Sequence, residues 1–363
     1  MDDLYDYILW LGGYSFSNVP FQDADAVILC LISYFDLSPL FEGADEVKLS
    51  AYRKQIDAGE VRFESMCDLE SSLRILKAAV ASRRFGDLSM TGYVDILLTR
   101  PPIQFSAVTF HSDAGWSFIA YRGTDNSLAG WREDFMISFT PTQAQEFSEE
   151  YARNRITPDR AWFIGGHSKG GNLALYAACK LSKEKRTSLR HVYVLDGPGF
   201  CPEVLDVGAI GAIEPLITRI IPGFSVIGRL FEPRIRATRI VRSSASGLMQ
   251  HDPASWCIDH GKLATLPQTL QSSNLIIEIL NKWIGNLARE DRRIFVNDVF
   301  DVLAAGGAKT LEALSAEGLL KGYEAMRLRL KSTSEITRRV LRNLSRQTLQ
   351  SILDALFRKE EDE

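Results

Sequence analysis

The sequence predicts an α/β fold: a mostly parallel sheet, helices on both faces of that sheet, and a helical segment at the C-terminal end. Between residues 107 and 242, short apolar runs of strand length alternate with segments whose apolar residues recur at helical spacing. This alternation favours a parallel sheet, because the helices that connect its strands cover the faces and bury them. From about residue 272 onward the pattern is helical only. We therefore expect one domain over residues 1–270 and a helical extension over 271–363 that packs on it.

Residues 1–90 are predicted to form a helical N-terminal part of the domain. Apolar residues recur at helical spacing over 4–11 until a pair of glycines stops the run, and the same spacing resumes over 25–35. Residues 44–85 continue as a charged amphipathic helix. We interpret the acidic residues of this part as solvated faces and assign no chemistry to them.

The predicted sheet begins with a hairpin, because two apolar runs at 107–112 and 116–121 flank the turn residues Asp-Ala-Gly. A helix over 142–155 separates this hairpin from a strand at 161–164. The later elements follow in order: a helix over 172–179, strands at 191–195, 217–222 and 236–242, a helix from 272, and helices over 309–330 and 334–358.

The composition is that of an ordinary globular protein, with 45% hydrophobic and 24% charged residues in 363. A net charge of -4 gives no global signal for nucleic acid. The five cysteines are scattered, which predicts reduced thiols in a cytoplasmic protein. The acidic N-terminus does not resemble a signal peptide, and the apolar run 26–35 is too short to span a bilayer. Since no metal-binding or nucleotide-binding motif is present, we expect no metal and no cofactor.

One short segment carries a nucleophile motif of the form G-x-S-x-G. Gly166, Ser168 and Gly170 supply its three defining residues, between an apolar strand and a helix of small residues. In this motif the serine occupies a strained turn, and the glycines let the two backbones approach each other. The helix N-terminus behind the serine directs N–H groups toward a developing oxyanion. We therefore predict that Ser168 is a nucleophile rather than an ordinary turn residue.

Three segments in this order resemble a lipase class 3 type of α/β-hydrolase: residues 118–124 with a following tryptophan and aspartate, the G-H-S-K-G-G segment, and a late strand followed by a histidine. The pattern over residues 1–265 is more closely similar to a bacterial family of uncharacterised lipase-like hydrolases. That family shares four motifs, which begin here at Asp6 (D-Y-x-x-W), Gly166 (G-H-S-K-G-G-N), Asp196 (D-G-P-G-F) and Gln250 (Q-H-D-P-x-S-W). The resemblance implies an α/β-hydrolase fold and ester hydrolysis, without naming the substrate.

A serine hydroxyl needs a neighbouring base, and the chain has five histidines. In α/β-hydrolases the base follows the last strand of the sheet. His251 and His260 both lie there, and His251 is nearer the strand and within a family-like motif. We predict His251 as the base and His260 as a surface residue; the competing interpretation makes His251 a surface residue too. The other three are excluded by their places. His111 lies in the middle of a strand, and His191 lies at the wrong end of the sheet. His167 is inside the turn but is expected to point away from the serine.

The acid is less clearly marked. Class 3 lipases carry it after the strand after next, where this chain has Ser225, which cannot hold a negative charge against an imidazolium. We favour Asp196, at the C-terminal end of the strand that follows the nucleophile helix. The alternative is that Asp196 only caps its own turn. Asp252, expected to point into its own loop, is a lesser candidate, and a dyad without an acid is a further one.

An oxyanion hole needs two donors, each of which lowers the barrier by about 3 kcal/mol. We expect the backbone N–H of Lys169 to supply one, and the resemblance assigns the other to Thr124, whose alternative role is that of a turn residue. The ammonium of Lys169 is either solvated or favours an anionic substrate group. Trp131 and Asp134 are expected to pin this oxyanion loop as packing and capping residues.

We therefore predict a serine hydrolase that cleaves an ester of an acyl lipid or small acyl substrate through an acyl-enzyme on Ser168. One alternative is an acyltransferase that passes the acyl group to an alcohol. Another is an inactive hydrolase fold used as a binding or regulatory module, which the serine at position 225 and the extra helices favour.

Two surface features complete the prediction. Residues 200–235 form a candidate cap with exposed phenylalanines at 200, 224 and 231. A basic stretch near the C-terminus is either a solvated helix face or a docking surface for anionic lipid headgroups or an acidic partner. It contains Arg327, Arg329, Lys331, Arg338, Arg339, Arg342 and Arg346.

Overall fold

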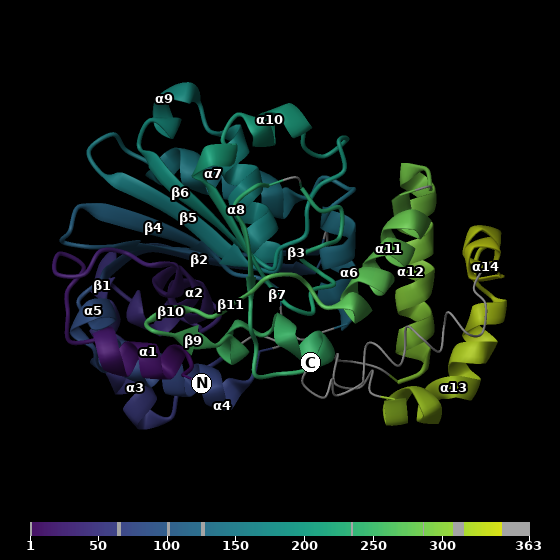
Figure 1. Ribbon diagram of the computed structural model, residues 1–363, viewed down its shortest axis with the longest axis horizontal. Helices are drawn as coiled ribbons and strands as arrows, with labels where there is room; N and C mark the ends of the chain where they lie inside the picture. Colours follow the sequence, from purple (N-terminus) through teal and green to yellow (C-terminus); the bar gives the residue numbers. More distant parts are fainter. Residues whose placement is uncertain are drawn as a thin grey trace.

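The computed structural model contains one large mixed sheet with helices on both of its faces (Figure 1). It describes residues 2–63, 67–99, 102–124, 128–233, 235–285, 287–307 and 316–342. In spatial order, the nine-stranded sheet consists of β1 (Glu46–Lys48), β2 (Ser89–Thr99), β3 (Pro102–His111), β4 (Trp116–Tyr121), β5 (Ala161–His167), β6 (Leu189–Leu195), β7 (Ile217–Pro222), β8 (Thr238–Val241) and β11 (Thr265–Leu266). A separate ribbon pairs β9 (Ile258–Asp259) with β10 (Lys262–Leu263).

The sheet is parallel only in its centre. Strands β4 to β8 lie side by side in chain order and form four parallel pairs. The other four pairs, at the two sides, are antiparallel. The mostly parallel sheet expected from the sequence is therefore a mixed one. The carboxyl ends of β5 and β6 meet at the same edge, which brings together the residues that follow them.

One face of the sheet is covered by α7 (Gln143–Arg155) and α8 (Lys169–Lys180). Because β4, β5 and β6 follow one another across the sheet, right-handed crossovers place both connecting helices on the same face. Their apolar side chains form one core with strand residues such as Ile119, Ile164 and Val192.

The opposite face is covered by the N-terminal part of the chain (Figure 1). Its helices are α1 (Leu4–Leu11), α2 (Asp23–Ile32), α3 (Arg53–Ala58), α4 (Leu69–Ala81) and α5 (Arg83–Gly86). Every residue of α2 after Asp23 is buried, and Phe118 and Ala120 of β4 share its core. The helices that connect the central strands lie on the other face, so this segment supplies the second helical layer of the fold.

Several predicted elements are confirmed, and the prediction for one region is wrong. The hairpin exists as the antiparallel pair β3–β4, the helix predicted over 142–155 is α7, and the strand predicted over 217–222 is β7. The single helix predicted over 44–85 is instead a short strand, a 3-10 turn and three helices. Strand β2 follows this region and is not predicted by the sequence. Its alternation of apolar and polar residues is interrupted where its register with β3 shifts, between Thr91 and Val94.

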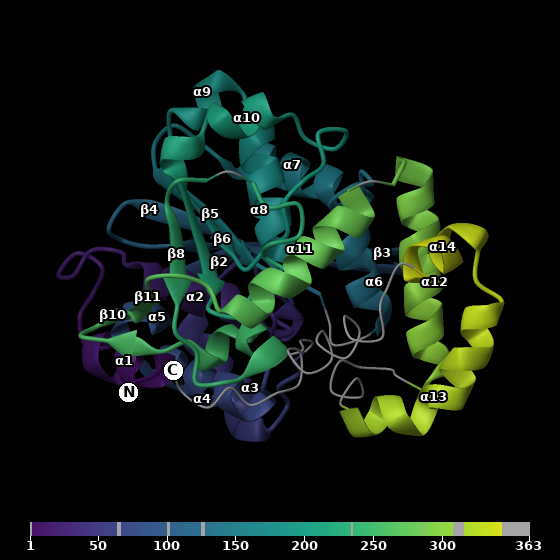
Figure 2. The same cartoon turned by 45° about the vertical axis from the view of Figure 1, so that its right-hand side comes forward.

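The C-terminal helices pack against one side of the sheet domain. They are α11 (Gln271–Gly285), α12 (Arg289–Ala305), α13 (Ala316–Lys331) and α14 (Glu335–Arg342). Three further helices lie between the strands of the sheet in the chain: α6 (Leu128–Ile137), α9 (Lys183–Arg186) and α10 (Val207–Gly211). In both views α11 lies between the sheet and α12, and α13 lies beyond α12 (Figure 2). The side chains of α11 and α12 join a third core with residues such as Phe139, Phe224 and Leu230.

The phenylalanines expected to be exposed in a cap are not. Phe200 and Phe224 are buried and Phe231 is partly buried. In the basic stretch, Arg327 and Arg329 form ion pairs with Glu324 and Asp301. The side chains of Arg338 and Arg339 are exposed, whereas those of Arg342 and Arg346 lie outside the described part.

Among the helices of the described ranges, none has both the length and the apolar character needed to cross a bilayer. All five cysteines fall within these ranges, where each is buried and no disulfide joins any two of them.

Candidate active site

Ser168 occupies a strained turn between the end of β5 and the start of α8. Its backbone has φ 57° and ψ −126°, a conformation that costs a residue with a side chain roughly 1–3 kcal/mol. A Cβ atom on Gly166 would lie 2.2 Å from the carbonyl carbon of Gly170, and one on Gly170 would lie 2.1 Å from the oxygen of Tyr121. The turn therefore requires both glycines.

Three buried side chains from separate segments contact one another in a row. His251 Nε2 lies 2.9 Å from Ser168 Oγ, and His251 Nδ1 lies 2.5 Å from Asp196 Oδ2. The three residues are 3%, 2% and 0% exposed, in the order His251, Ser168, Asp196. When Nδ1–H donates to the carboxylate, Nε2 carries a lone pair directed at the serine hydroxyl. This geometry allows the imidazole to accept the serine proton.

Asp196 is held in place by side-chain donors on both carboxylate oxygens. It follows β6 directly, with a positive φ of 42°, and its N–H donates to the oxygen of Ile220 on β7. Oδ1 accepts from the hydroxyl of Ser225 at 2.5 Å, while Oδ2 faces His251. Ser225, at the position where the resemblance placed the acid, thus contacts the carboxylate of Asp196. The carboxylate does more than cap its own turn.

The other candidates lie away from this row. Asp252 Oδ1 accepts from the N–H of Ala254 at 2.8 Å, and its Oδ2 accepts from the N–H of Asp68 at 2.7 Å. It therefore points into its own loop, as expected, and also ties that loop to the start of α4. The side chain of His260 is 96% exposed. His111 contacts Thr91 and Ser117 on the two neighbouring strands. His191 contacts Thr218.

His167 supports the backbone of His251, a contact that the sequence did not predict. Its Nε2 donates to the carbonyl oxygen of His251 at 2.8 Å, which leaves Nδ1 to accept from the hydroxyl of Tyr34, also at 2.8 Å. Burial, together with the nearby His251, holds the pKa of His167 well below its usual value. The ring is therefore neutral and keeps one tautomer. Tyr34 comes from the N-terminal part, to which the sequence alone assigns no chemistry.

The predicted oxyanion loop lies against the serine turn. Thr124 is 3% exposed, between β4 and α6. A Cβ atom on the preceding Gly123 would lie 2.0 Å from the hydroxyl of Tyr34 and 2.6 Å from the oxygen of His167. Only glycine therefore lets the loop approach the turn this closely. Trp131 and Asp134 belong to α6, but their side chains lie outside the described part of the chain.

The side chain of Lys169 is neither solvated nor directed at open space. It is 1% exposed, and Nζ donates to both the backbone oxygen and Oε1 of Gln104 at 3.2 Å. The third acceptor of Nζ is the carboxylate of Glu133 on α6, at 3.4 Å. Of the two alternatives for this ammonium, the solvated one is wrong, because the charge is buried and Gln104 and Glu133 supply the acceptors and counterion that a buried cation needs. Lys169 thus joins the start of α8 to β3 and α6.

Asn172 is a second supporting residue that sequence reasoning did not single out. It is fully buried; its Oδ1 accepts from the amide of Gln145 at 2.9 Å, and its Nδ2 donates to the oxygen of Pro198 at 3.0 Å. It therefore connects α8 with the segment after Asp196. The G-H-S-K-G-G-N motif contains this residue, so its spacing after the serine was the available signal.

Among the residues that the structure describes, no three His, Cys, Asp or Glu side chains converge as a metal site would require.

The chain resembles known proteins at the level of a family and of two lipase structures. The family model described as Mbeg1-like matches residues 79–301. A crystal structure of M37 lipase is similar with a TM-score of 0.35 and 15% identity, covering 58% of this chain and 70% of that one. Lipase II from Rhizopus niveus is similar with a TM-score of 0.33 and 17% identity, covering 62% of this chain and 83% of that one. Comparison with curated proteins gives no match.

Proposed function

We propose that this chain, which belongs to the Mbeg1-like family, is a serine hydrolase with an α/β-hydrolase fold that cleaves a carboxylic ester through an acyl-enzyme on Ser168. The observation that carries the proposal is the buried row from Ser168 through His251 to Asp196. A nucleophile, a base and an orienting acid are the three parts that serine-based acyl transfer requires.

In the proposed reaction, Ser168 Oγ attacks the ester carbonyl while His251 Nε2 takes the hydroxyl proton. Asp196 holds the Nδ1–H of His251 and stabilises the imidazolium that forms. The N–H of Lys169 and the N–H or hydroxyl of Thr124 stabilise the oxyanion. His251 then gives its proton to the leaving alcohol, and a water molecule repeats the sequence to release the acid and free Ser168.

Two alternatives differ in how the site is used. An inactive hydrolase fold was favoured by the serine at position 225, but the contact of Asp196 with His251 supports a complete set of catalytic groups. An acyltransferase would use the same Ser168 acyl-enzyme and pass the acyl group to an alcohol in place of water. Product analysis with an added alcohol separates these two outcomes.

The substrate in this proposal is an ester of an acyl lipid or a small acyl compound. The resemblance of the sequence to class 3 lipases supports such a substrate class. Peripheral membrane contact through the basic C-terminal helices and a cytoplasmic location stay predictions.

The proposal is tested with Ser168→Ala and a short p-nitrophenyl ester. We expect turnover by the unaltered protein and at least a 10³-fold loss in the variant, with a nearly unchanged Tm. Ser244→Ala, which removes an exposed hydroxyl bonded to the oxygen of Ser255, is the matched control and should keep full activity. Turnover that survives in Ser168→Ala would refute the assignment.

A further inference from the structure

One loop carries the groups that support Asp196, and we call residues 223–232, between β7 and β8, the acid loop. Ser225 donates to Asp196 Oδ1 at 2.5 Å. A Cβ atom on Gly228 would lie 2.1 Å from the same oxygen, so the backbone of the acid loop lies directly against the carboxylate. The position of the acid loop therefore sets the position of the carboxylate.

A buried arginine holds the acid loop from the sheet side. Arg219 on β7 is 1% exposed; Nη2 donates to the oxygen of Gly228 and Nη1 to the carboxylate of Glu232, both at 2.7 Å. Burial lowers the pKa of this guanidinium, while the nearby carboxylates of Glu232 and Asp196 act in the opposite direction. Arg219 thus binds the acid loop by its backbone and adds a positive charge near the acid.

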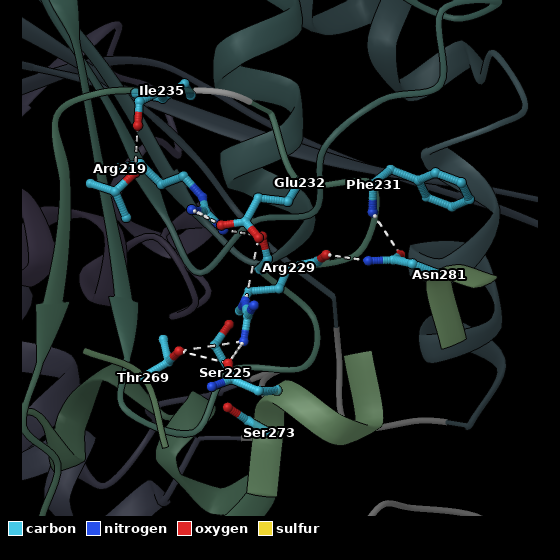
Figure 3. Close-up of polar contacts among 12 residues, drawn as sticks. Arg219, Ser225, Arg229, Phe231, Glu232, Ile235, Thr269, Ser273 and Asn281 are labelled. Carbon is cyan, nitrogen blue, oxygen red and sulfur yellow. Dashed lines mark hydrogen bonds and ion pairs between the residues drawn. The ribbon is translucent and has the colours of Figure 1, made fainter. Parts of the chain in front are cut away.

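The outer side of the acid loop is bound by α11 through polar contacts. Arg229 donates to Oδ1 of Asn274, and its Nε lies 3.4 Å from Glu232. Asn281 contacts the loop backbone twice: its Nδ2 donates to the oxygen of Arg229 at 3.2 Å, and its Oδ1 accepts from the N–H of Phe231 at 3.3 Å. Figure 3 shows Glu232 between Arg219 and Arg229, and the backbone nitrogen of Phe231 facing the side chain of Asn281.

The face of α11 that carries Asn274 and Asn281 also packs on the acid loop with apolar side chains. Residues 274, 277, 281 and 284 recur at helical spacing and therefore lie on one face of the helix. Ile277 and Ile284, both buried, belong to one core with Phe224, Ile227 and Leu230 of the acid loop. The acid loop is therefore enclosed between β7 and α11, with polar and apolar contacts on its outer side.

We propose that α11 is a positioning element for the catalytic acid, acting through Arg229 and Asn281 on the acid loop that holds Asp196. The proposal rests on the proposed serine chemistry and gives the C-terminal extension a role in it. A loop without regular structure is fixed by what packs on it, and loosening α11 frees Ser225 and Gly228 to move relative to the carboxylate. Displacement of a reacting group by about 1 Å costs on the order of 10²-fold in rate.

The test uses two full-length variants that cut the α11 contacts and leave every group that contacts Asp196 in place. Arg229→Ala removes the contacts to Asn274 and Glu232, and Asn281→Ala removes both contacts to the loop backbone. We expect each to lower kcat about 10-fold with KM within twofold, and to slow labelling of Ser168 by a fluorophosphonate by a similar factor. The control is Arg236→Ala, in the same β7–β8 connection, because its side chain is 94% exposed and pairs with Glu214. It should behave like the unaltered protein.

A background without the acid separates positioning from general destabilisation. If Arg229 acts through Asp196, Arg229→Ala should lower kcat less than twofold when added to Asp196→Asn, because the group that it positions is already lost. A purely structural role would lower activity by the same factor in both backgrounds. Assays are run well below the Tm of each variant, so that a change in folded fraction does not enter.

The outcomes distinguish this inference from the proposed function. If the unaltered protein neither hydrolyses esters nor reacts with the fluorophosphonate at Ser168, the proposed function is refuted. If it does both, and the Arg229 and Asn281 variants keep kcat within twofold or lose equal factors in both backgrounds, α11 does not position the acid.

Discussion

Replacing Asp196 by asparagine isolates the charge of the predicted acid while keeping its shape. The carboxylate is 0% exposed and lies 2.5 Å from His251 Nδ1. Two unit charges about 4 Å apart interact by about 4 kcal/mol at the effective dielectric constant of about 20 that suits such sites. Because the imidazolium exists only along the reaction, that loss falls on kcat, and we expect a drop of about 10³-fold.

The assay is steady-state hydrolysis of a p-nitrophenyl ester, with Asp252→Asn as the matched control. Asp252 accepts backbone N–H groups of Ala254 and Asp68, so its amide variant should lose stability while kcat stays within threefold. If Asp196→Asn keeps kcat within threefold while Asp252→Asn loses it, the acid has been assigned to the wrong residue. If neither variant loses rate, the histidine works without an acid.

Three further predictions follow from individual contacts. Gly228→Ala places a Cβ atom 2.1 Å from Asp196 Oδ1, so kcat should fall about 10²-fold; an unchanged kcat would show that the loop can move aside. Tyr34→Phe leaves Nδ1 of buried His167 without its donor, which should lower the free energy of unfolding by about 1–3 kcal/mol in urea titrations. Burial lowers the pKa of His167, so below about pH 6.5 the unfolded chain binds a proton that the folded chain does not. The free energy of unfolding should therefore fall as the pH drops below 6.5, by about 1.4 kcal/mol per pH unit from this residue, and a value constant from pH 7 to 5 would contradict this.

The sequence predicts the centre of the fold well because the central strands are buried on both faces. Runs such as 116–121 and 217–222 consist mainly of apolar residues, and both correspond to strands of the structure. The N-terminal layer is predicted less well. The short strand β1 takes its conformation from pairing with β2 at the edge of the sheet, and the 3-10 turn after it from packing against α4 and α5, neither of which local spacing encodes.

The candidate site divides in the same way. Ser168, with its glycines, is visible because a tight turn imposes a local pattern, and the structure contains that turn. The contacts of Tyr34 with His167, of Lys169 with Glu133, and of Ser225 with Asp196 join residues far apart in the chain. Such pairs leave no periodic or spacing signal, so they emerge only when the fold has brought the segments together.

The most direct test of the central claim is labelling of the folded protein with a fluorophosphonate, followed by peptide mapping. The claim predicts one adduct, on the peptide that contains Ser168, that is abolished by Ser168→Ala and by prior unfolding. His251→Ala should slow its formation by at least 10³-fold, because the hydroxyl then lacks its base. An adduct that persists in Ser168→Ala, or folded protein that does not react, would contradict an activated serine at this turn.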